Sequence, residues 1–231
     1  MAILAFLNAW LITRLWFTFR DQPLPLREWL VLAVVQLLLV GLITPGFHSV
    51  ILAAAVFGAL ALSEQFIPRE RLNEGRLAGS FLVIGVSFGI AQYAAPELWI
   101  PAPEQPENLR PFFLGLSGFL LVANETNLAI RVLLHRFQME PKSTSSNHSG
   151  PVDDREYNAG RVIGMLERWL IYLVVILAQN YNVIALILAA KGVARFRQLE
   201  EREFAEYVLI GTLASILLTV MIGQAILYLL P

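Results

Sequence analysis

The sequence contains no cysteine and only three histidines. The absence of cysteine excludes disulfides, thiolate metal ligands and a cysteine nucleophile. The histidines, His48, His135 and His148, are far apart in the chain and lack the spacing of metal ligands, so we expect no metal and no cofactor. Phosphate-binding loops, nucleophile elbows, zinc-protease helices and dinucleotide fingerprints are also missing. The sequence therefore assigns no catalytic residue, and we do not expect an enzyme of a familiar soluble type.

Charged residues are also scarce in this sequence. Only 15% of the residues are charged and 57% are hydrophobic, whereas an ordinary soluble domain carries about 25% charged residues. The formal net charge of −1 gives no basic excess that would attract nucleic acid. This balance indicates that lipid is the solvent, and it predicts an integral membrane protein whose main partner is the lipid bilayer.

Apolar runs bounded by charged or turn-forming residues recur along the whole chain. They predict an all-α fold, a polytopic transmembrane helix bundle with about eight spans. The first run lacks the basic start and the small-residue cleavage site of a signal peptide, so we interpret it as a retained helix. The eight expected spans are Met1–Phe19, Trp29–Thr44, Val50–Leu62, Leu77–Ala95, Phe112–Ile130, Ile163–Gln179, Val183–Phe196 and Tyr207–Leu230.

Turn residues between spans predict two tight hairpins, one at Pro45-Gly46 and one at Gln179 to Asn182. The second hairpin has an alternative interpretation. Only about 18 Å of helix separates Arg168 from Asn180, less than a hydrocarbon core about 30 Å thick. Six full spans plus a re-entrant hairpin formed by the sixth and seventh runs therefore stay open as an alternative.

The basic residues indicate the orientation, because short loops rich in lysine and arginine stay in the cytoplasm. Most of the 17 basic residues fall in alternate loops. The loops between them hold only Arg110, within an acidic, proline-rich segment at 96–111. We therefore expect a multi-pass protein of the inner, cytoplasmic membrane, with both termini on the non-cytoplasmic side.

A Ser/Thr/Asn/Gly-rich stretch divides the chain. We expect residues 1–138 to form a five-span N-terminal membrane region, 139–158 a flexible cytoplasmic linker, and 159–231 a three-span C-terminal membrane region.

Ionisable residues inside expected spans are the strongest functional signal, since a charge at a helix centre costs about 2.5 to 3.5 kcal/mol of insertion free energy. We expect them to meet one to two helical turns from the cytoplasmic surface. The predicted intramembrane cluster comprises Asn124, Glu125, Asn127, Glu167, Arg168 and Lys191.

Three functional hypotheses follow from this cluster. The first is a small transporter or permeation component that moves a small solute or ion. The second is a membrane enzyme or binding protein for an anionic lipid or lipid-linked phosphate, contacted by Arg161, Arg168, Lys191 and Arg195. The third is an accessory or scaffold subunit with a membrane-protein partner, or a homo-oligomer. A purely structural network that fixes helix register is the alternative to all three.

Small residues recur every four positions in the last span, at Gly211, Ser215, Thr219 and Gly223. Such a stripe lets helix backbones approach closely. We expect this face of the last helix to pack against another span.

Three blocks in the last third of the chain carry a resemblance. They are Asn158-Ala-Gly-Arg-Val-Ile-Gly-Met-Leu-Glu-Arg168, Ala189-Ala-Lys-Gly-Val-Ala-Arg-Phe196 and Ala205-Glu-Tyr-Val-Leu-Ile-Gly-Thr-Leu-Ala-Ser215. In this order the chain resembles a family of uncharacterised bacterial multi-spanning membrane proteins over roughly residues 157–225. The resemblance implies a bacterial membrane location and supplies no reaction or ligand.

Overall fold

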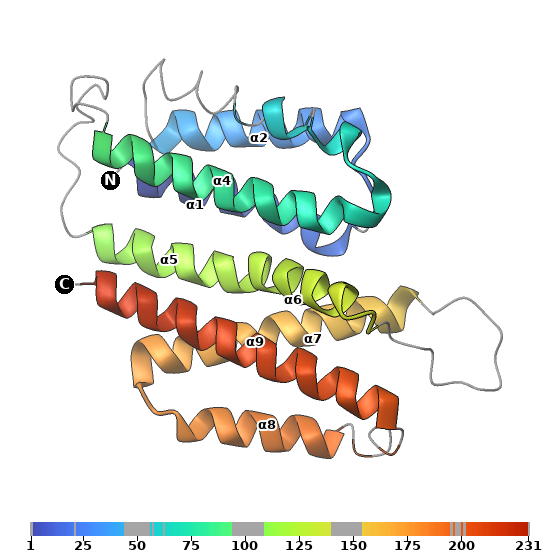
Figure 1. Ribbon diagram of the computed structural model, residues 1–231. Coiled ribbons are helices and arrows are strands. Elements are labelled where there is room, and N and C mark those ends of the chain that lie inside the picture. Colours follow the sequence, from blue (N-terminus) through green and yellow to red (C-terminus); the bar gives the residue numbers. More distant parts are fainter. Residues whose placement is uncertain are drawn as a thin grey trace. The chain divides into compact units, whose positions relative to one another are not determined.

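The computed structural model is built from helices, and its described residues contain no strand (Figure 1). This confirms the predicted all-α fold. The structure describes residues 2–20, 22–43, 56, 58–61, 63–93, 109–139, 154–194, 196, 200 and 202–230. The chain divides into two compact units, Met1–Leu120 and Leu121–Pro231.

The first unit is arranged around its N-terminal helix. Helix α1 (Ala2–Arg14) continues into a 3₁₀ helix (Leu15–Phe19) and packs against α2 (Leu26–Ile43) and α4 (Leu72–Tyr93) (Figure 1). A short 3₁₀ turn (Arg69–Arg71) leads into α4, and α5 (Arg110–Ala123) begins in the same unit. All side chains from Phe6 to Leu11 of α1 are buried, so this helix is part of the core of the first unit.

Helix α1 makes polar contacts with three neighbouring helices. The Asn8 amide donates to Phe113 O of α5 at 3.0 Å, and the Thr13 hydroxyl donates to Gln36 Oε1 of α2 at 3.3 Å. The Arg14 guanidinium donates to Ser80 Oγ of α4 at 2.7 Å. Because these partners lie on different sides of α1, the three hydrogen bonds set the rotation of α1 within its unit.

The second unit begins with the end of α5 and contains α6 (Glu125–Arg136), α7 (Asp154–Leu173), α8 (Asn182–Ala194) and α9 (Arg202–Leu229) (Figure 1). A π-helical turn, Val174–Ala178, ends α7. The predicted turn at its end is confirmed: Gln179 adopts a left-handed conformation, φ 48°, and the Asn182 amide donates to Asn180 Oδ1 at 3.2 Å.

The predicted packing face of the last helix is also found. A Cβ placed on Gly223 would lie 2.7 Å from Val175 Cγ1, and a Cβ on Gly211 would lie 3.9 Å from Leu134 Cδ1. Thr219, between them, is fully buried. The small-residue face of α9 therefore packs against α6 and the π-helical end of α7.

The number of spans differs from the expectation of about eight. Within the described residues, two helices are long and apolar enough to cross a membrane, Arg110–Arg136 and Phe204–Leu229. Helix α7 is 20 residues long, about 30 Å, but it carries Arg161, Glu167 and Arg168. Helix α8, with 13 residues, is only about 20 Å long. Most of the third expected span, the Pro45-Gly46 turn, most of the 96–111 loop and most of the 139–158 linker lie outside the described residues.

Candidate functional site

The fifth expected span is interrupted near its middle. The sequence analysis treated Phe112–Ile130 as one continuous helix, whereas the structure ends α5 at Ala123 and starts α6 at Glu125. Asn124, between them, has φ −102° and ψ −53°. Asn124, Glu125 and Thr126 are all buried. An interruption in the middle of an apolar helix thus coincides with its most polar stretch.

A side chain from α7 contacts the backbone at the interruption. Arg168 donates from Nε to Val122 O at 2.7 Å and from Nη2 to Ala123 O at 3.1 Å. In a continuous α-helix these two carbonyls would accept from the amides four residues further on. A guanidinium that inserts into this ladder explains a local break without proline or glycine. Arg168 therefore supplies a cation to the C-terminal, electronegative end of α5.

On the other side of the interruption, a carboxylate meets the N-terminus of α6. Glu125 lies in the first turn of this helix and is 7% exposed. Its Oε1 accepts a hydrogen bond from Asn124 Nδ2 at 2.8 Å. A negative charge at this position is favoured by the helix dipole. Both helix ends at the interruption are thus matched by charged side chains of the opposite sign.

Glu167 and Lys191 form an ion pair that joins α7 to α8. Their side chains are 21% and 18% exposed, so the pair is less buried than Arg168. Residues 167 and 191 are almost equally distant from the Gln179 turn, and antiparallel pairing of the two helices brings them together. The structure therefore joins two of the residues that the sequence singled out.

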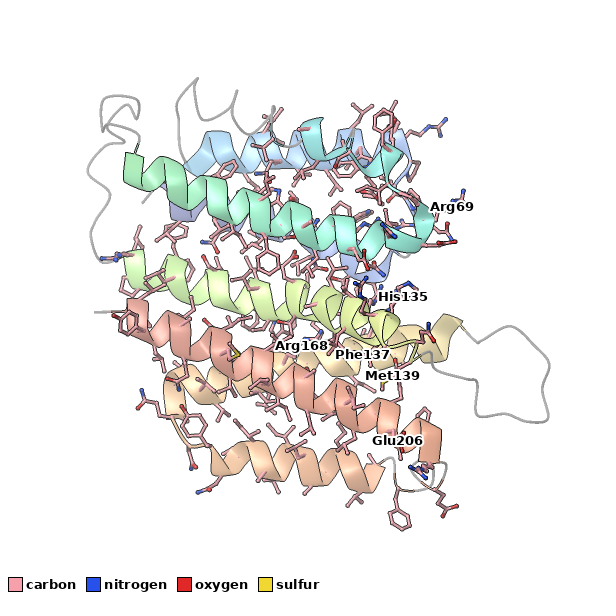
Figure 2. All side chains as sticks on the ribbon, viewed as in Figure 1. Arg69, His135, Phe137, Met139, Arg168 and Glu206 are labelled. Atoms are coloured by element: carbon pink, nitrogen blue, oxygen red, sulfur yellow. The ribbon has the colours of Figure 1, made fainter. Side chains whose placement is uncertain are left out.

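Asn124 and Arg168 both lie far from the ends of the helical segments that carry them. Asn124 lies about 21 Å from the start of Arg110–Arg136 and about 18 Å from its end. Arg168 lies about 21 Å after Asp154 and about 15 Å before Ala178. Figure 2 shows Arg168 well inside the second unit, away from His135 and Glu206 near one end. Lys191, in contrast, lies one helical turn before the end of α8 at Ala194. The predicted position of the cluster relative to the cytoplasmic surface stays a prediction.

Three predicted residues remain, and they lie in different places. Asn127 is half-buried on α6, one turn from the interruption. Arg161 is buried on α7, two turns before Arg168. Arg195 lies outside the described residues. Of the predicted headgroup contacts that the structure describes, Arg161 and Arg168 are buried and Lys191 is paired with Glu167.

The sequence analysis missed a second buried ionic group, in the first unit. Arg76 and Glu64 form an ion pair at 2.6 Å with side chains 4% and 6% exposed. Arg76 also donates to Arg20 O at 2.6 Å and Gln22 O at 3.0 Å. The Phe17 ring lies 4.9 Å from the Arg76 guanidinium and 5.1 Å from that of Arg14. These contacts hold the α1–α2 connection in place. Arg14, an arginine inside the first apolar run, was the sequence signal that could have indicated this ionic group.

Among the described residues, no group of three histidine, aspartate or glutamate side chains is placed to hold a metal ion. The interruption instead combines a buried guanidinium, a buried carboxylate and two amide side chains. Such a set can bind and orient a small polar or charged solute, or carry a proton.

The predicted resemblance to uncharacterised bacterial membrane proteins stays a prediction. No protein family, no curated protein and no solved structure matches this chain.

Proposed function

We propose that this chain is an integral membrane protein with several spans and that it acts as a small transporter or permeation component. The membrane setting is supported by the exposed face of α9. Leu209, Leu213, Leu217 and Met221 are each more than half exposed, and Tyr228 continues the same side. This stripe is about 28 Å long, close to the thickness of the hydrocarbon core. Soluble monomers rarely expose so long an apolar surface.

A second exposed apolar face supports the same setting in the first unit. On α2, Leu30, Val31, Val34 and Leu38 are between 56% and 61% exposed. Gln36, on the same helix, is buried against α1. Helices in lipid are expected to show this pattern, with apolar side chains on the outside and polar side chains on the inside.

The transport proposal rests on the interruption at Asn124. Discontinuous helices near the middle of the membrane form the binding sites of many transporters, because they place helix ends and polar side chains in an otherwise apolar layer. Here the interruption brings Asn124, Glu125 and Arg168 to mid-helix. The Glu167–Lys191 pair lies on the neighbouring hairpin and is the more exposed part of the cluster. We therefore place the solute path past this pair, towards the interruption.

Reconstitution into liposomes tests the proposal. Purified protein is assayed with a panel of ions and small charged solutes, and we expect protein-dependent flux for at least one of them. Asn124→Leu should reduce that flux strongly while an exposed change, Arg202→Gln, leaves it unchanged. Absence of flux across a broad panel, with protein that is folded and correctly inserted, counts against transport.

A second candidate is binding of an anionic lipid or lipid-linked phosphate. Arg161 and Arg168 favour it, since both are buried on the same face of α7. Mass spectrometry of lipids that co-purify with the protein distinguishes the two functions. Lipid binding would be supported if one anionic lipid is enriched and Arg161→Gln abolishes this enrichment. Co-purification of only random or neutral lipids would contradict lipid binding. A stoichiometric protein partner would instead favour an accessory subunit.

A further inference from the structure

The turn between α7 and α8 lies beside the C-terminal part of α9 (Figure 1). Gln224 of α9 donates a hydrogen bond from Nε2 to the hydroxyl oxygen of Tyr181, in the turn. The end of α7 packs at the same level, since a Cβ on Gly223 would lie 2.7 Å from Val175 Cγ1. The turn is therefore held near one end of α9.

This contact determines how far the α7–α8 hairpin extends along α9. Gln224 lies about 33 Å after Arg202, the first residue of α9. The chain leaves the turn at Tyr181 and returns to Arg202, so it covers this length of α9 again, about 20 Å of it as α8. A distance of about 33 Å is enough to cross a hydrocarbon core about 30 Å thick. A re-entrant hairpin would turn back inside that core.

The exposed surface changes in character at this end of the second unit. Apolar side chains lead up to it, and Leu177, Leu186 and Met221 are 77%, 70% and 59% exposed. Exposed amide and phenol side chains begin within four residues of each, about one helical turn. These side chains belong to Gln179, Asn180, Tyr181, Asn182, Gln224 and Tyr228, and we call them the tyrosine–amide surface.

The composition of the tyrosine–amide surface matches the interface between lipid and water. None of its residues is charged, and tyrosine is enriched where its ring can lie against acyl chains while its hydroxyl reaches the headgroups. The opposite ends of α8 and α9 carry charges instead, with Lys191 in the last turn of α8 and the exposed Arg202–Glu206 pair in α9. Basic residues at one end and neutral tyrosines at the other are the pattern of helices whose basic end faces the cytoplasm.

We propose that the tyrosine–amide surface docks into the headgroup layer of the bilayer, on the leaflet opposite to Arg202. This inference rests on the membrane setting of the proposed function and is independent of transport. Its consequence is that the α7–α8 hairpin crosses the membrane completely, in place of the re-entrant hairpin that the sequence left open.

Depth-dependent fluorescence quenching tests this position. A small thiol-reactive fluorophore is attached to a single cysteine, Asn180→Cys or Tyr228→Cys, in the natural chain, which has no cysteine. Each protein is reconstituted into phosphatidylcholine vesicles that contain lipid with a nitroxide either near the headgroup or near the middle of the acyl chain. We expect the headgroup nitroxide to quench both positions more strongly than the mid-chain nitroxide does.

Leu217→Cys is the matched control on the same helix as Tyr228. Leu217 is 61% exposed and lies about 17 Å before Tyr228 along α9, which places it near the middle of the hydrocarbon core. The order of quenching should therefore be reversed at this position, with the mid-chain nitroxide more effective.

The other outcomes separate this surface from the membrane setting and from transport. If Asn180→Cys or Tyr228→Cys shows no preference for the headgroup nitroxide, the proposed docking is wrong, and preference for the mid-chain nitroxide at Asn180→Cys would indicate a re-entrant hairpin. If neither nitroxide quenches these two positions but Leu217→Cys is quenched, water or a protein covers the surface. Absence of quenching at all three positions would contradict the membrane setting itself. The expected quenching without flux would remove transport and leave this surface.

Discussion

At the residue scale, two ion pairs differ in burial and therefore in what their removal should cost. Glu64–Arg76 is almost fully buried, whereas Glu167–Lys191 is about one-fifth exposed. Removing one partner of a buried pair strands the other charge, which costs about 3 to 5 kcal/mol. Exposed pairs contribute about 0 to 1 kcal/mol.

Glu64→Gln should therefore lower the free energy of unfolding by about 3 to 5 kcal/mol. The change keeps the shape of the side chain but leaves the Arg76 guanidinium without its carboxylate. Glu28→Gln is the control, because Glu28 pairs with Arg20 at a site where the two side chains are 24% and 47% exposed. That change should cost less than about 1 kcal/mol. Denaturant or thermal unfolding in detergent measures both.

Lys191→Met should lower the free energy of unfolding by an intermediate amount. The loss should be larger than for a substitution at an exposed ion pair and smaller than for one at a fully buried pair. The double change Lys191→Met with Glu167→Gln should recover part of the loss, because no charge is then left unpaired. A double-mutant cycle measured by thermal unfolding gives the coupling. Strictly additive effects would show that each side chain reaches water and that the pair contributes nothing. Arg202→Met, at an exposed pair with Glu206, should produce no measurable change.

At the element scale, α9 and the end of α7 are held by a contact that tolerates only glycine. Gly223→Val should destabilise the protein by about 1 to 3 kcal/mol, the usual cost of overpacking, since the new Cβ would lie 2.7 Å from Val175 Cγ1. Val175→Ala in the same chain should restore part of this loss. Gly192→Ala, where the space is open, should be neutral or stabilise by up to about 1 kcal/mol through helix propensity. An equal loss at both glycines would contradict the packing argument.

The elements also show what a single sequence could and could not predict. The Glu167–Lys191 ion pair could be predicted from the sequence, because both residues lie on a predicted hairpin at similar distances from its turn. The capping of α5 by Arg168 was not, since its acceptors are the backbone carbonyls of Val122 and Ala123, which any residue carries. No proline or glycine lies at the interruption at Asn124, so the apolar pattern predicted one continuous helix there.

The network in the first unit was missed for a different reason. Arg76 follows the third apolar run, so the sequence marks it only as one of the basic residues that fall in alternate loops. Its contacts reach Arg20 and Gln22, more than 50 residues away in the chain. Only the packing of α4 beside α1 brings these groups together. Contacts of this length depend on tertiary structure, and no local spacing predicts them.

At the scale of the whole molecule, the orientation in the membrane rests on the alternation of basic and acidic loops. Because the natural chain has no cysteine, single cysteines report accessibility without any background. Cysteines introduced at Ser145 and Glu104 should react with an impermeant thiol reagent from opposite sides of the membrane, Ser145 from the cytoplasm. Cells expressing each variant are labelled intact and after permeabilisation, with an unmodified chain as the blank.

The same two positions also test how many helices cross the membrane between them. Glu104 and Ser145 flank Arg110–Arg136, one of the two described helices that satisfy the criteria for a span. Opposite labelling requires an odd number of crossings in this interval, which a single helix interrupted at Asn124 but continuous in direction provides. Labelling from one side would contradict a single crossing by Arg110–Arg136 and the orientation inferred from the basic residues. The transport proposal, which needs Asn124 to lie in the middle of a membrane-crossing helix, would then lose its basis.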